Sequence, residues 1–183
     1  MIVNTTGFSG LFEIQQKTHQ DHRGHFSRLF CQQALREIRE DLHFVQINFS
    51  HTVLKGSLRG MHCQKKPAAE AKLVRCIHGR VLDVVVDLRQ GSTTFLKYFA
   101  TELSSENNRA LFIPEGFAHG FQALTDNASL IYMHTEYWSQ ADEFGVHYAD
   151  PRIAIDWPLK VTQCSERDLQ HPFLAAEFRG FTE

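Results

Sequence analysis

The sequence is poor in cysteine, and no two cysteines lie close enough along the chain to suggest a shared zinc site. The four are Cys31, Cys63, Cys76 and Cys164, and none forms a CxxC pair, which is the commonest cysteine-based zinc signature. Their wide spacing is also unlike the disulfide framework of a small secreted protein. We therefore expect four free thiols.

An excess of positive charge is also missing. The 183 residues have a formal net charge of −2, whereas nucleic-acid affinity depends on neutralising many backbone phosphates. We therefore expect no nucleic-acid partner. A few well-placed arginines and lysines can still hold a diphosphate, because that requires local geometry rather than net charge.

Long apolar runs are absent too. No stretch approaches the roughly 20 apolar residues that span a bilayer, and residues 1–10 contain no signal-peptide pattern. These absences predict a cytoplasmic protein without a membrane partner. The five prolines and eleven glycines are scattered, so we find no linker, repeat or low-complexity tract and predict a single domain over residues 1–183.

The sequence does contain many short β-branched and aromatic runs, from about residue 44 to residue 137, separated by Gly, Asn, Asp and Ser. This pattern predicts an all-β sandwich or barrel. A Gly-containing link at 78–80 predicts a hairpin between two of the runs, and three successive valines at 84–86 predict burial on both faces of a strand. We expect strands at 44–49, 72–77, 81–88, 94–103, 110–113 and 129–137.

Helix is a minority. Apolar residues recur at helical spacing only over 31–42, at Cys31, Leu35, Ile38 and Leu42, which predicts one helix covering the sheet. A second short helix is expected in the polar tail after Cys164. There, Ser165-x-x-Asp168 resembles a helix capping box, so locally Asp168 is best explained by helix-start electrostatics.

The segment 112–121 contains Pro-x-Gly-x-x-His, which ends at His119. It resembles the second signature of cupin barrels, although alone it could be a simple turn. The first cupin signature normally supplies a His-x-His pair, but here it reads His62-Cys63-Gln64. Because the second histidine is missing, these motifs cannot assemble a complete ligand set, which predicts a cupin without a metal.

Three further side chains each have two interpretations. His62 is either a packed strand histidine or a general base. Lys72, at a strand start among apolar neighbours, either stabilises a developing enolate oxygen or extends its ammonium group to solvent. Tyr132 is either a packing residue or a proton donor.

Several motifs, in unbroken order over roughly residues 20 to 170, together resemble the dTDP-4-dehydrorhamnose 3,5-epimerase family. Each motif alone is weak, but the ordered set is highly specific. The motifs are Asp21-x-Arg23-Gly24-x-Phe26, Gln46-x-Asn48-x-Ser50, Leu58-Arg59-Gly60-Met61-His62-x-Gln64, Lys72-Leu73-Val74, Asp83-Val84-x-Val86-Asp87-x-Arg89, Ser92-x-Thr94-Phe95, Ile113-Pro114-x-Gly116-Phe117-Ala118-His119-Gly120-Phe121, and Asp150-Pro151 through Trp157-Pro158.

The resemblance implies a cupin-type β-sandwich, or jelly roll, with one or more short helices, which acts as a homodimer without metal or organic cofactor. It implies catalytic roles for His62 as general base, Asp168 as the carboxylate that orients it, Tyr132 as general acid, and Lys72 beside the C4 oxygen. The residues that it implies for binding the nucleotide-diphosphate sugar are Arg23, Phe26, Arg28, Gln46, Asn48, Arg59 and His119.

The implied reaction inverts C3, C5 or both in a nucleotide-linked 4-keto-6-deoxyhexose. A hydrogen beside a ketone is acidic because the enolate spreads charge onto oxygen, so the site needs a base and a cation. Asp83 is a less favoured partner for His62 than Asp168. Arg28 replaces a glutamate found in many dTDP-specific members, which leaves CDP or another nucleotide open. A single-centre epimerase, a metal cupin and a non-catalytic sugar-binding cupin are the alternatives.

Overall fold

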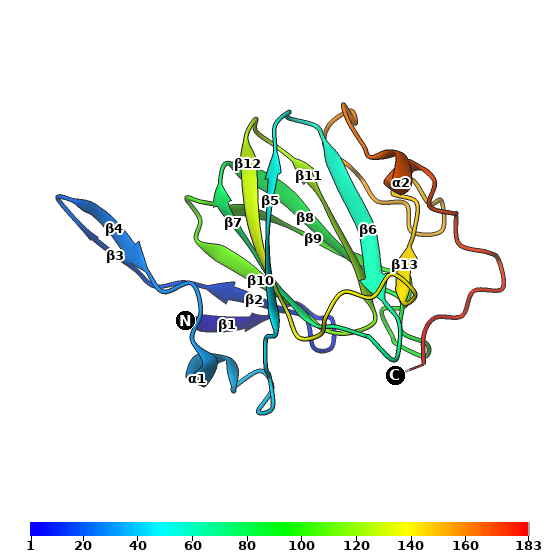
Figure 1. Ribbon diagram of the computed structural model, residues 1–183, viewed down its shortest axis with the longest axis horizontal. Coiled ribbons are helices and arrows are strands. Elements are labelled where there is room, and N and C mark those ends of the chain that lie inside the picture. Colours follow the sequence, from blue (N-terminus) through cyan, green and yellow to red (C-terminus); the bar gives the residue numbers. More distant parts are fainter. Residues whose placement is uncertain (183) are drawn as a thin grey trace.

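The computed structural model describes residues 1–182 and consists mainly of two β-sheets packed face to face (Figure 1). All paired strands run antiparallel. The six-stranded sheet has the order β1 (Ile2–Thr5), β2 (Phe12–Gln15), β10 (Arg109–Ile113), β7 (Lys72–His78), β12 (Ala128–His134), β5 (Gln46–Thr52). The five-stranded sheet has the order β13 (Glu143–Gly145), β6 (Leu58–Gln64), β11 (Phe117–Ala123), β8 (Arg80–Asp87), β9 (Tyr98–Ser104).

Apolar residues from both sheets fill the space between them. Val74 and Leu130 from the six-stranded sheet pack with Val85 and Phe121 from the five-stranded sheet in one buried cluster. The strand residues on either side of Val85 belong instead to a second cluster, behind the five-stranded sheet, which the C-terminal segment covers with Leu174. The predicted β-sandwich and the predicted two-sided burial of residues 84–86 are therefore confirmed.

The predicted hairpin at 78–80 is wrong. β7 lies in one sheet and β8 in the other, so the chain changes sheets at Gly79 rather than folding back on its neighbour. Gly79 has a φ of +71°, and a Cβ there would lie 2.5 Å from Thr125 Oγ1. A tight corner between sheets and a hairpin both need glycine with positive φ, so local sequence does not distinguish them.

The helix predicted over 31–42 is also wrong in length. α1 spans only Gln32–Leu35, and the chain then continues in turns. The Gln32 side chain donates a hydrogen bond to the Leu42 carbonyl, which ties the two ends of this segment together. Leu35 and Leu42 nevertheless both pack on Phe112 of the six-stranded sheet. The apolar spacing thus identified the contacts with the sheet, which tertiary packing achieves without a regular helix.

The strand expected over 94–103 begins later, because β9 starts at Tyr98. Residues 92–97 form turns instead, anchored by Ser92 and Thr94, which both donate hydrogen bonds of 2.6 Å to the buried carboxylate of Asp87. Leu96 in this segment has a φ of +61°, which is incompatible with a strand. The polar anchor therefore overrides the β propensity of the sequence there.

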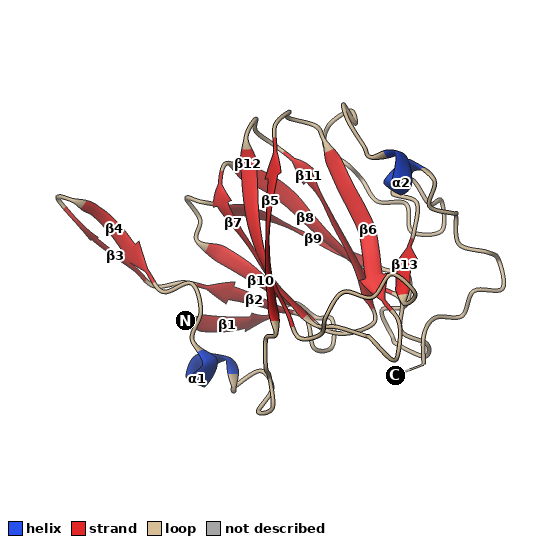
Figure 2. Ribbon diagram, viewed as in Figure 1, coloured by secondary structure: helices blue, strands red, loops and turns tan. Residues whose placement is uncertain are grey.

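Two small elements lie outside the sandwich. β3 (Thr18–Asp21) and β4 (Gly24–Ser27) form a separate hairpin that projects away from the body (Figure 1). After β13 the chain runs mostly as loop beside the five-stranded sheet and contains α2 (Glu166–Leu169), as Figure 2 shows. No helix among residues 1–182 has the length and hydropathy of a membrane span.

Candidate active site

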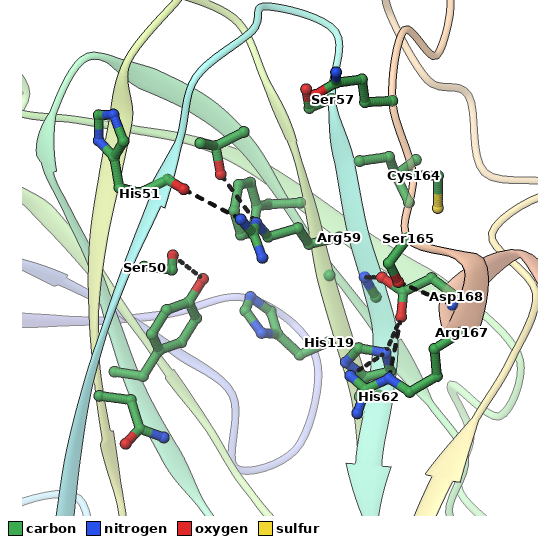
Figure 3. Close-up of a pocket in the computed structure, with 18 of the residues that line it drawn as sticks. Ser50, His51, Ser57, Arg59, His62, His119, Cys164, Ser165, Arg167 and Asp168 are labelled. Carbon is green, nitrogen blue, oxygen red and sulfur yellow. Dashed lines mark hydrogen bonds and ion pairs between the residues drawn. The ribbon is translucent and has the colours of Figure 1, made fainter.

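An open cleft lies between the two sheets and reaches the C-terminal segment around α2. Its volume of about 1110 Å³ exceeds that of most small-ligand pockets, which suits a ligand larger than one sugar ring. Figure 3 shows polar side chains from both sheets converging on it. Its lining includes Asn48, Ser50, Arg59, His62, Lys72, His119, Tyr132, His134, Arg167 and Asp168.

His62 and Asp168 form a hydrogen-bonded pair. His62 lies on β6, and its Nε2 is 2.8 Å from Asp168 Oδ1 on α2 (Figure 3). The other carboxylate oxygen of Asp168 accepts a hydrogen bond from the Gly60 backbone N–H at 3.1 Å. Ser165 caps α2 by accepting from Asp168 N, so the predicted cap exists and the carboxylate is free to face His62.

The pair has defined charges and tautomer. Burial alone would raise the pKa of Asp168, but its hydrogen bonds with His62 and Gly60 outweigh burial and lower that pKa to about 2. The carboxylate is therefore ionised and accepts a hydrogen bond from the Nε2–H of His62. Arg167 Nη2 is farther from this nitrogen, at 3.4 Å. The basic lone pair of a neutral His62 then lies on Nδ1.

Lys72 is held at the cleft by an acidic partner. It begins β7, is only 9% exposed, and its Nζ lies 3.1 Å from Glu70 Oε1. Glu70 Oε2 also lies 2.7 Å from His134 Nδ1. Burial opposes ionisation of Glu70, yet the hydrogen bond with His134 and the charge of Lys72 lower its pKa. Lys72 is thus a fixed buried cation and does not extend to solvent.

Tyr132 approaches the cleft from the opposite sheet to His62. It lies on β12, and its hydroxyl is 3.2 Å from Ser50 Oγ on the neighbouring strand β5. Burial raises its pKa above the usual value, so the phenol stays protonated near neutral pH. A protonated hydroxyl across the cleft from an imidazole is able to donate a proton to the face that the imidazole does not reach.

His119 and Arg59 line the same cleft. His119 Nε2 lies 2.8 Å from Asp83 Oδ2, and both side chains are buried. The less favoured suggestion that Asp83 partners His62 is therefore wrong, because the strand register places Asp83 opposite Phe121, diagonally across from His119, where the two side chains bond. The Arg59 guanidinium donates to Thr52 Oγ1 and to the His51 carbonyl.

Asn48 lines the cleft. Gln46 is not in the lining but donates a hydrogen bond of 3.1 Å to Asn48 Oδ1. Three other residues expected to bind substrate are not brought into the cleft of their own chain. Arg23 lies at the tip of the projecting hairpin and pairs with Asp21, Phe26 is 68% exposed on β4, and Arg28 follows that strand.

Sequence reasoning missed several polar groups at the site. Glu70 bonds Lys72, and His134 bonds Glu70, as described above. His134 could have been found from its spacing, because it lies two residues after Tyr132 on β12 and so faces the same side of the sheet. His171, just after α2, packs its ring against that of His62, with centroids 5.0 Å apart. His62, Asp168 and His171 form a group whose donor atoms all lie within 4.8 Å of one another.

Comparisons with known proteins identify a family for the chain. The family model described as dTDP-4-dehydrorhamnose 3,5-epimerase matches residues 5–176. A protein of that name from Shigella flexneri is 40% identical, over 97% of this chain and 99% of its own length. A dTDP-4-dehydrorhamnose 3-epimerase from Streptomyces niveus is 39% identical, over 98% of this chain and 86% of its own.

A solved structure is similar as well. The dTDP-6-deoxy-D-glucose-3,5-epimerase from Legionella pneumophila, in complex with dTDP-4-keto-L-rhamnose, superposes with a TM-score of 0.86 and 42% identity. The match covers 91% of this chain and 89% of the Legionella chain. The similarity in fold and sequence confirms the predicted cupin-type jelly roll.

Proposed function

The chain belongs to the dTDP-4-dehydrorhamnose 3,5-epimerase family, and from this premise we propose that it inverts both C3 and C5 of a dTDP-linked 4-keto-6-deoxyhexose. The predicted class, a nucleotide-sugar epimerase that moves protons next to the C4 ketone, is confirmed by the family. The choice of dTDP, the inversion of both centres and the role of each side chain form the proposal.

One observation carries the proposal: His62 and Tyr132 lie on opposite sheets and line one cleft. Inversion of a carbon requires that its proton leave from one face and that another arrive at the opposite face. An ionised Asp168 stabilises the His62 imidazolium after proton abstraction, and the protonated Tyr132 supplies the new proton. A site with acid and base on the same wall would instead return the proton with retention.

The enolate formed between these steps needs a positive charge at its oxygen. Lys72 supplies one from the buried end of β7, since Glu70 holds its Nζ in place at 3.1 Å. A preorganised cation in a partly desolvated site stabilises developing negative charge more effectively than water does. We assign Lys72 to the C4 oxygen for this reason, and Arg59, His119 and Asn48 to the sugar and the diphosphate.

We further propose a homodimer in which the β3–β4 hairpin of one chain completes the cleft of its partner. The hairpin projects from the body (Figure 1), and its Arg23 and Phe26 are not in the lining of their own cleft, yet the family resemblance assigns both to substrate. Edge strand β5 also exposes Ile47 and Phe49, at 65% and 63%, which is typical of an interface. A monomeric mass in solution, or an unchanged KM for Phe26→Ala, would contradict this arrangement.

The function is tested by proton NMR in deuterated water, with dTDP- and CDP-linked 4-keto-6-deoxyglucose offered separately. We expect deuterium at both C3 and C5 of the dTDP sugar. Exchange at C3 alone would place the chain with the 3-epimerase from Streptomyces niveus, to which it is 39% identical. His62→Ala is expected to abolish exchange while nucleotide affinity persists, and unchanged exchange would refute His62 as the base.

A cytoplasmic location stays a prediction.

A further inference from the structure

A third metal-binding side chain stands beside the proposed base and its carboxylate. The His171 ring contacts the His62 ring edge to face, at an interplanar angle of 80°. His171 Nε2 lies 3.7 Å from Asp168 Oδ1, the same oxygen that accepts from His62 Nε2 at 2.8 Å. Two imidazoles and one carboxylate at such separations are the donor set of many zinc sites.

The fold holds His171 in this place. A Cβ at Gly145, which pairs with His62 across β13 and β6, would come within 2.1 Å of the His171 ring, so the strand leaves room for that ring only because residue 145 is glycine. His171 Nε2 is buried and has no hydrogen-bond partner among residues 1–182. Burying a nitrogen without a partner costs free energy. A bound ligand at His171 Nε2 would offset this cost.

We propose that His62, Asp168 and His171 bind a divalent transition-metal ion, Zn²⁺ in particular, and that this ion switches the epimerase off. The ion is an inhibitor and takes no part in the reaction. The inhibitory effect rests on the proposed function, because it requires His62 to be the base. The binding itself does not, since it depends only on the three donor groups.

The inhibition follows from the tautomer of His62. In the metal-free site Asp168 holds the proton on Nε2, and the lone pair on Nδ1 is basic. Zinc at Nε2 takes the place of that proton, and a neutral imidazole then has its single proton on Nδ1. The Nε2 proton is lost to solvent and Nδ1 takes up another from solvent, so the ring stays neutral and Nδ1 can no longer take a hydrogen from carbon.

The charges around the site permit a cation. Asp168 supplies negative charge at the centre of the site, because its Oδ1 lies 2.8 Å from His62 Nε2 and 3.7 Å from His171 Nε2. Arg167 is the nearest positive charge, but its side chain is 58% exposed and pairs with Glu143 at 3.2 Å. Arg167 Nε also lies 3.6 Å from Asp168 Oδ1, so the ion displaces this exposed side chain into solvent while the Asp168 carboxylate stays in place.

Binding is measured by equilibrium dialysis of the chelator-stripped full chain against zinc chloride, with cobalt(II) absorption as a second signal. We expect one Zn²⁺ per chain, and an affinity lowered on the order of 100-fold in His171→Asn, because losing a ligand costs at least as much as losing an outer partner. His43→Asn, an exposed histidine between α1 and β5, is the matched control and keeps the affinity. The absence of stoichiometric zinc, or equal affinity in His171→Asn, would overturn the site.

Inhibition is measured as the rate of deuterium incorporation from solvent. We expect zinc to abolish incorporation in the unmodified chain and in His43→Asn, and a chelator to restore it. His171→Asn is expected to need on the order of 100-fold more zinc. Bound zinc that left the rate unchanged would overturn the switch. Activity that required zinc would also overturn the switch. A chain inactive both with and without zinc would instead refute the epimerase function, while dialysis would still decide the metal site.

Discussion

Replacing Asp168 by asparagine tests the proposed catalytic pair with the least change in shape. The amide oxygen can still accept from the Gly60 N–H, which now lies 3.1 Å from the carboxylate. The amide NH₂, however, faces His62 Nε2 and donates to it. This moves the imidazole proton to Nδ1, so the variant removes both the negative charge and the reactive tautomer.

The structure sets the size of the effect. The pKa of Asp168 falls from its usual 3.8 to about 2, and this difference corresponds to about 2 kcal/mol, or roughly 30-fold in rate. The His62 bond is the largest of the interactions that lower it. The wrong tautomer adds to this loss, so we expect kcat to fall on the order of 10²- to 10⁴-fold, with little change in KM.

The assay is deuterium incorporation at C3 and C5 under saturating substrate, with nucleotide affinity measured separately. Asp83→Asn is a matched control, because Asp83 makes the same kind of pair with His119, also at 2.8 Å. Since His119 is assigned to substrate binding, this control is expected to raise KM more than it lowers kcat. If Asp168→Asn retained a kcat within about threefold of the unmodified chain, His62 would not depend on this carboxylate.

Three further outcomes follow from the same contacts. The fold lowers the pKa of Asp168 from 3.8 to about 2, so its ionised form contributes about 2 kcal/mol to stability above pH about 4, and this contribution disappears as the pH falls through about 2. The free energies of unfolding in urea of the unmodified chain and of Asp168→Asn should therefore converge over this range, and a constant difference would contradict the assignment. Tyr132→Phe removes the hydroxyl that contacts Ser50, so we expect deuterium exchange with retention to exceed inversion at least about tenfold; normal inversion would exclude Tyr132 as the acid. Gly60→Ala places a Cβ 2.6 Å from the Gly120 Cα at a φ of +107°, which should destabilise the chain by at least about 2 kcal/mol in thermal unfolding; an unchanged melting temperature would show that the backbone there can shift freely.

Local patterns in the sequence were enough for the class of fold and for most strands. Alternating and β-branched runs place β7, β8, β10 and β12 within one to three residues of the structure, because side-chain period 2 is a property of the strand itself. The free state of the four cysteines was also predictable and is confirmed. The ordered motifs identified the family, since they encode turns and inward-facing polar residues at fixed spacing.

Tertiary structure alone decided which groups meet. His62 and Asp168 are 106 residues apart. Two carboxylates were candidates for the same imidazole, and the pairing of β8 with β11 decided between them, because it brings Asp83 within hydrogen-bond distance of His119. His171 carried no motif at all, and it joins the site only because Gly145 leaves room for its ring. A sequence specifies the local preferences of its residues, whereas contacts between distant groups depend on how the sheets pair and pack. Each neighbour that packing adds to a group changes the burial, the charge and the proton position of that group together.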